Sequence, residues 1–111
     1  MELGIEARPD GVAIVRPVGR LDLLSAAEFK QCLAETVSGG HHRLVVDLQG
    51  IPFIDSSGLG ALIGGLKAAR VAGGDLRLAR PGEQARVIME LTSLDRVLRL
   101  YDAVEEALSG W

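Results

Sequence analysis

Two short polar segments carry most of the side chains that could do chemistry. One is Asp55-Ser56-Ser57-Gly58, and the other is Gly19-Arg20-Leu21-Asp22. Each follows an apolar run that predicts a strand, and a helix between those runs makes the two strands parallel. Loops that follow parallel strands open at the same edge of a sheet. We therefore expect Asp22, Asp55 and the two serines to lie close together.

Catalysis by this chain alone is not expected. A serine hydrolase needs a base directed at its nucleophile, but His41 and His42, the only histidines, are predicted at the opposite end of the sheet. The G-x-S-x-G elbow and the phosphate-binding motifs G-x-x-x-x-G-K-S/T and G-x-G-x-x-G are absent. The paired histidines lack a cysteine or a second acidic residue beside them, so we expect no metal site and no cofactor.

The two serines allow two interpretations. Asp55, Ser56 and Ser57 are all residues that cap helix N-termini, so the segment is compatible with an ordinary helix start. A serine at that position is also suited to accept a phosphate, because free backbone N–H groups and the positive end of the helix dipole stabilise the added charge. Gly58 and Gly60 would keep the surface low enough for another protein to approach the hydroxyl.

Composition narrows the function classes further. The 111 residues are 48% hydrophobic with a net charge of −3, which predicts one folded domain over residues 1–111 and argues against a nucleic-acid partner. A single cysteine, Cys32, fits a reducing compartment. No secretory signal is visible, and the longest apolar stretch is less than half of the roughly 20 residues that cross a bilayer. We expect a cytoplasmic protein without direct membrane insertion, a monomer or weak dimer.

Apolar periodicity predicts the element order ββαβαβαβα. This order indicates an α/β domain with a mainly parallel sheet, an antiparallel edge hairpin and helices packed on the sheet. Ser25 and Glu28 have the spacing of a capping box, and Gly64-Gly65 inside the second helix indicates either close packing or a partner-facing groove. After the hairpin around residues 9–11, we expect helices from about Ser25 to 38, from about Ser57 to 72, over 83–91 and from a cap at Asp102 to 108, with strands at 44–48, 76–79 and 97–100.

Three separated motifs resemble one known family. The segment Asp55-Ser56-Ser57-Gly58-Leu59-Gly60, preceded by Val46-Asp47-Leu48, is similar to the signature of the STAS domain, the fold of bacterial anti-sigma factor antagonists. Residues 19–22 resemble the family's G-x-L-D. Residues 90–97, ELTSLDRV, resemble its E-L-T-G-L-D-R-V, with Ser93 where many relatives have glycine. The resemblance spans essentially the whole chain in matching element order.

The resemblance implies a partner switch that regulates transcription. The unphosphorylated antagonist would bind an anti-sigma factor, often itself a serine kinase, and so release the sigma factor. Phosphorylation at Ser57 would abolish binding, and a PP2C-type phosphatase would reset the switch. An alternative that the resemblance also allows is a STAS scaffold or accessory subunit of a stressosome or of a membrane lipid or anion transporter. The partner-binding residues implied are Asp22, Asp55, Ser56, Gly58 and Leu59.

Overall fold

The computed structural model describes residues 1–111 and contains the predicted elements in the predicted order. The α/β class and the ββαβαβαβα order are confirmed. Only one short 3-10 helix, η1, adds to the expected set. The elements are β1 (Glu2–Ala7), β2 (Val12–Val18), α1 (Ala26–Ser38), β3 (Arg43–Asp47), α2 (Ser56–Val71), β4 (Asp75–Ala79), α3 (Glu83–Leu91), η1 (Leu94–Arg96), β5 (Leu100–Tyr101) and α4 (Val104–Leu108).

The strands form one mixed sheet in the order β1-β2-β3-β4-β5. β1 pairs with β2 antiparallel, and the other neighbours pair in parallel. The pairing of β2 with β3 covers Val12 to Val15 and stops before Pro17, which has no N–H for a ladder on that side. The carboxyl ends of β2, β3 and β4 therefore lie at one edge of the sheet.

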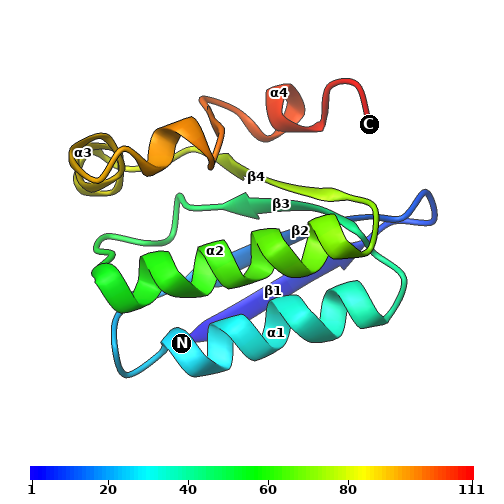
Figure 1. The fold of residues 1–111 in the computed structure, drawn as a ribbon, viewed down its shortest axis with the longest axis horizontal. Coiled ribbons are helices and arrows are strands. Elements are labelled where there is room, and N and C mark those ends of the chain that lie inside the picture. The colour runs from blue at the N-terminus through cyan, green and yellow to red at the C-terminus, as the bar shows by residue number, and fades with distance from the viewer.

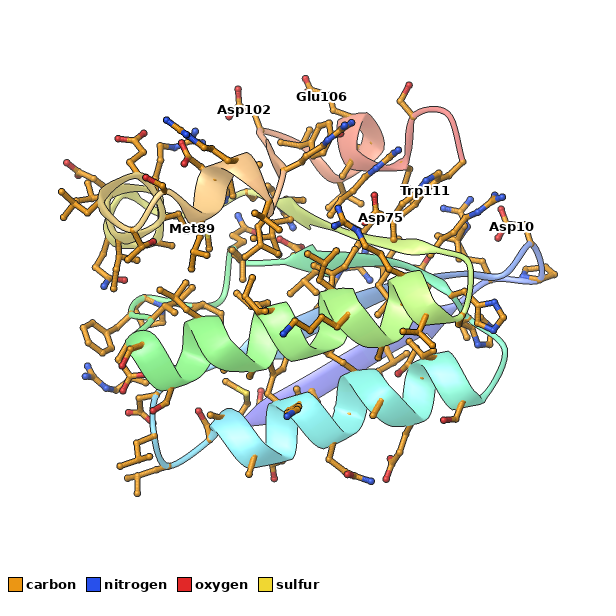
Figure 2. The ribbon with its side chains drawn as sticks, viewed as in Figure 1. Asp10, Asp75, Met89, Asp102, Glu106 and Trp111 are labelled. Carbon is orange, nitrogen blue, oxygen red and sulfur yellow. The ribbon has the colours of Figure 1, made fainter.

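Helices cover both faces of the sheet, which explains why the inner strands β2 and β3 contain continuous apolar runs. Figure 1 shows α1 and α2 on one face and α4 on the other, with α3 near the end of the sheet where α2 begins. In Figure 2 Trp111 lies on the α4 side, and Met89 points from α3 into the domain. The larger core includes Ala13, Val15, Leu44, Val46, Leu76 and Leu78, and the smaller one consists of Ile14, Val45, Ala79 and Ala107.

The glycine pair in α2 serves close packing of the two helices. A Cβ at Gly65 would overlap Leu33 of α1 and lie 3.2 Å from Leu76 Cδ1 of β4, whereas at Gly64 it would lie 2.8 Å from the mobile end of Lys30. Cys32 is buried in the same layer, where desolvation raises the pKa of its thiol. No helix combines the length and apolar character needed to span a bilayer.

An ion pair between the partly exposed Arg80 and the buried Asp47 anchors the loop between β4 and α3. The Asp47 side chain is 3% exposed and receives two hydrogen bonds from the guanidinium of Arg80, one of them 3.1 Å long from Nε. This bonding to Asp47 raises the pKa of Arg80. Arg80 has φ of +53°, a region that disfavours residues with a side chain. The ion pair thus holds a turn that the local sequence alone does not favour.

One of the two predicted helix caps is wrong, and the other is confirmed in position only. Ser25 is the N-cap residue of α1, as predicted, but its side chain makes no cap bond, because its Oγ donates to the Arg20 carbonyl at 2.7 Å and accepts from the Asp22 N–H at 3.1 Å. Asp102 does not cap α4, whose N-cap is Ala103, and instead accepts from Arg86 at 3.1 Å. In both cases the side chain has a partner outside the helix it was expected to cap.

The final strand is shorter and later than predicted. It covers Leu100–Tyr101 rather than residues 97–100. Ser93 adopts a left-handed φ of +60°, and the Leu94 carbonyl accepts from the N–H groups of Val97 and Leu98. The N–H groups of Val97 and Leu98 are therefore bonded within this turn and cannot pair with a strand, so the ladder with β4 begins only at Leu100.

Candidate functional site

The two polar segments lie side by side at the carboxyl edge of the sheet. Leu21 and Ile54 form a parallel bridge, in which Leu21 N–H donates to the Phe53 carbonyl at 3.0 Å. The Asp55 N–H donates to the Leu21 carbonyl at 3.2 Å. The structure therefore brings together the segments whose proximity the parallel strands predict.

The Asp55 carboxylate joins these segments through both of its oxygens. Oδ1 accepts from the Gly58 N–H at 2.9 Å, which makes Asp55 the N-cap of α2. Oδ2 accepts from the Leu23 N–H at 3.1 Å, across 32 positions of sequence. α2 thus begins at Ser56, one residue earlier than predicted. Because the carboxylate is committed to two backbone donors, it serves the geometry of the site.

Asp22 organises its own loop. Its Oδ1 accepts from the Leu24 N–H at 3.0 Å, and its Oδ2 accepts from Arg20 Nε at 3.4 Å. The Arg20 guanidinium in turn lies 4.2 Å from the centre of the Phe53 ring, a cation–π contact with the neighbouring segment. The loop before α1 is therefore tied to the start of α2 by Asp55 and Arg20, whereas Asp22 shapes it from within.

Both serine hydroxyls are left free by this arrangement. Ser56 is exposed and Ser57 half-buried in the first turn of α2, and neither side chain makes a hydrogen bond within the chain. The helix cap comes from Asp55, so the N-cap interpretation of the segment applies to that residue alone. The hydroxyl of Ser57 is available at the end of the helix where the dipole favours negative charge.

Two residues of the expected partner site, Gly58 and Leu59, are buried. A Cβ at Gly58 would overlap the Leu21 carbonyl oxygen and lie 2.8 Å from Leu21 Cγ. Leu59 belongs to the larger core. Gly60, by contrast, is exposed and a Cβ there would meet nothing within 4 Å. Gly60 is therefore the glycine that leaves the surface near Ser57 free of a protruding side chain.

Sequence reasoning missed the two most conspicuous side chains near this site. Leu23 and Leu24 are 74% and 94% exposed, on the loop that Asp55 and Asp22 hold in place. Their exposure could have been predicted from their position, because both leucines precede the apolar stripe of α1 and so do not belong to the face of that helix that packs on the core. Large apolar side chains held in water beside an ordered polar site indicate a surface for another protein.

His41 and His42 lie between α1 and β3, at the amino ends of the parallel strands. They are thus at the opposite end of the sheet from the serines, as predicted. No three His, Cys, Asp or Glu side chains gather into a group that could hold a metal ion.

Comparison with known proteins gives one consistent family. A profile described as STAS domain matches residues 6–107. A Thermotoga maritima protein provisionally named an anti-sigma factor antagonist is 32% identical over 100 residues, covering 89% of this chain and 88% of its own. The anti-sigma-F factor antagonist RsfB of Mycobacterium tuberculosis is 29% identical over 103 residues, covering 91% of this chain and 82% of its own.

Solved structures agree with these sequence matches. The crystal structure of a provisionally named anti-sigma factor antagonist from Thermotoga maritima superposes with a TM-score of 0.88 at 29% identity, covering 96% of this chain and 91% of that one. The anti-sigma factor antagonist SpoIIAA in its unphosphorylated form gives 0.81 at 19% identity, covering 96% and 93%. Its phosphorylated form, from Bacillus, gives 0.74 at 19%, covering 96% of both chains. At that identity SpoIIAA shows a shared fold.

Two alanine substitutions in the first turns of α2 should have opposite effects on stability. Gly58→Ala should lower the free energy of unfolding by about 1–3 kcal/mol, because the methyl group meets a backbone carbonyl that has no room to move. Gly60→Ala should raise it by up to about 1 kcal/mol, because the site is open and alanine favours helix. Urea unfolding followed by circular dichroism measures both, and equal effects would contradict the close approach of α2 to Leu21.

Proposed function

The chain belongs to the STAS domain family, and from that premise we propose that it is an anti-sigma factor antagonist switched by phosphorylation of Ser57. Unphosphorylated, it binds an anti-sigma factor that is also a serine kinase, and thereby releases a sigma factor. A PP2C-type phosphatase restores the binding form. The observation that carries the proposal is the free hydroxyl of Ser57 in a helix turn capped by Asp55, beside two exposed leucines. The chain acts as a binding protein, and the kinase supplies the catalysis.

The partner surface is assigned to the exposed side chains around Ser57. Leu23 and Leu24 supply apolar contact area, and Gly60 leaves the approach to the hydroxyl open. Ser56 stands exposed beside the acceptor. The half-buried aspartates and the buried residues contribute differently. Asp55, Gly58 and Leu59 hold the first turn of α2 against Leu21, and Asp22 holds the loop that presents the leucines.

Charge is the proposed means of release. A phosphoserine carries about −1.5 to −2 charges, and it would join Asp55 on one face of a chain that is already acidic. At about 5 Å from a partner carboxylate and an effective dielectric constant of about 20, each unit charge costs roughly 3 kcal/mol. Reversing a 99:1 bound population needs about 5.5 kcal/mol. Repulsion of a doubly charged phosphate therefore has the required size.

The two serines should differ as phosphate acceptors. Ser57→Ala should resist phosphorylation and stay bound to the anti-sigma factor, whereas Ser56→Ala should still gain about 80 Da, one phosphoryl group. Neither serine caps the helix, so both variants should melt within about 3 °C of the wild type. Intact-mass and tandem mass spectrometry after incubation with the kinase and ATP locate the phosphate. Modification of Ser57→Ala at the wild-type level would overturn the assignment.

Phosphorylation should release the partner without unfolding the chain. The α2 N-terminus offsets part of the cost of the phosphate within the fold, by up to about 2 kcal/mol, so the melting temperature should change little while affinity falls at least about 100-fold. A thermal melt and an isothermal titration on one phosphorylated preparation, at two salt concentrations, test this. Loss of affinity only where the phosphorylated domain has melted would contradict the mechanism.

Truncation of Leu24 should weaken partner binding selectively. Leu24→Ala should raise the dissociation constant for the anti-sigma factor at least about fivefold, because a central apolar contact is worth more than about 1 kcal/mol. The matched control is Val71→Ala, since Val71 is 90% exposed but lies at the far end of α2. Both changes should leave stability within about 0.5 kcal/mol. Equal effects of the two variants on binding would place the partner surface elsewhere.

A further inference from the structure

One side chain of α3 is bonded to the backbone just before the helix cap of α2. Gln84 lies in the first turn of α3, and its Oε1 accepts from the Ile54 N–H at 2.9 Å. Its Nε2 donates to the Ile54 carbonyl at 2.8 Å. Ile54 is fully buried and directly precedes Asp55, so the bonded peptide groups belong to the segment that positions the serines.

The opposite edge of the same segment is already occupied. Leu21, in the segment that follows β2, bonds to the backbone groups of Phe53 and Asp55. The N–H and carbonyl of Ile54 face the other way, toward α3, and no strand reaches them there. The primary amide of Gln84 presents the donor and acceptor of a peptide group, and so completes the pairing that a neighbouring strand would have supplied. Residues 53–55 are thereby held on both edges.

The helix that carries Gln84 is itself anchored. The turn before α3 is held at Arg80 by the ion pair with the buried Asp47, and Met89 and Ala85 of α3 are buried in the larger core. Because α3 is fixed in this way, the two hydrogen bonds from Gln84 hold the Ile54 backbone in one position relative to α3. Both polar groups of its side chain point inward to that residue, which leaves them unavailable for contact with a partner.

We propose that Gln84 is a positioning residue for phosphoryl transfer to Ser57. It holds Ile54 and Asp55 in register, and Asp55 in turn sets the first turn of α2 and the direction of the Ser57 hydroxyl. This inference rests on the proposed function, in which Ser57 is the acceptor. Loss of the amide leaves two buried peptide groups without partners and loosens the segment beside the acceptor.

The test combines a measurement on the free chain with one on the reaction. Gln84→Met keeps the size of the side chain and removes both hydrogen bonds, whereas Gln84→Glu keeps the acceptor and replaces the donor by an oxygen that repels the Ile54 carbonyl. Glu83→Gln is the matched control, since it changes a neighbouring side chain of the same turn that makes no bond to the loop. Gln84→Glu keeps the test decisive if the methionine variant does not fold.

In the free chain, hydrogen exchange by NMR should show the Ile54 amide exchanging at least about 10-fold faster in Gln84→Met than in the wild type, with Glu83→Gln unchanged. In the reaction, the anti-sigma factor kinase that phosphorylates the wild-type chain, with Mg²⁺ and ATP, serves as the probe. The kcat for phosphorylation of the Gln84 variants should fall about 10- to 100-fold, the scale of a misplaced reacting group. The KM for the chain should stay within about threefold, since Gln84 faces inward.

Each result decides a separate point. An Ile54 amide that stays protected in Gln84→Met would overturn the role of Gln84 in holding the segment. Faster exchange with an unchanged kcat would overturn the positioning role while leaving the proposed function intact. A wild-type chain that accepts no phosphate at Ser57 would overturn the proposed function and, with it, the positioning role in transfer, whereas the exchange result would still decide whether Gln84 holds the segment.

Discussion

The carboxylate of Asp55 is the interaction on which the rest of the site depends. One oxygen accepts from the Gly58 N–H and so starts α2, and the other accepts from the Leu23 N–H and so orders the loop before α1. Bonds between a carboxylate and backbone N–H groups are charge-assisted and stronger than neutral ones. A single side chain thus bonds to both segments, which the Leu21–Ile54 bridge and the Arg20–Phe53 contact also join, and it leaves both serine hydroxyls unbonded.

Close approach is the structural consequence of this arrangement. Asp55 and the Leu21–Ile54 bridge draw the first turn of α2 onto the backbone of Leu21, so there is no space for a side chain at Gly58. Gly60, two residues further on, has no such neighbour and leaves the surface open instead. The same two glycines in a sequence motif therefore have different physical roles, one inside the fold and one at its surface.

The site is a presented surface rather than an enclosed pocket. The Asp55 and Asp22 carboxylates are committed to holding loops in place, and the exposed residues beside the half-buried Ser57 include Ser56, Leu23 and Leu24. This division is consistent with the proposed function, in which a serine must enter the active site of another protein while its own backbone stays ordered. In that proposal, rigid support from Asp55 and Gln84 reduces the entropy that the segment loses when a partner binds it.

Local sequence patterns determined the order of the elements, the α/β class and the meeting of the two polar segments. Apolar periodicity defines each helix or strand, and glycines mark where helices end, so both can be recognised from a few neighbouring residues. The parallel placement of β2 and β3 follows from the helix between them. The helix start at Ser25 was right, but its side-chain cap bond, the cap at Asp102 and the strand at Val97 were wrong, because each of those groups found a competing partner once the chain had folded. The exposure of Leu24 and the bonds from Gln84 to Ile54 were likewise decided by tertiary structure. Gln84 and Ile54 are 30 positions apart, and only the packing of α3 against the sheet edge brings an amide side chain to a peptide group that no strand can reach.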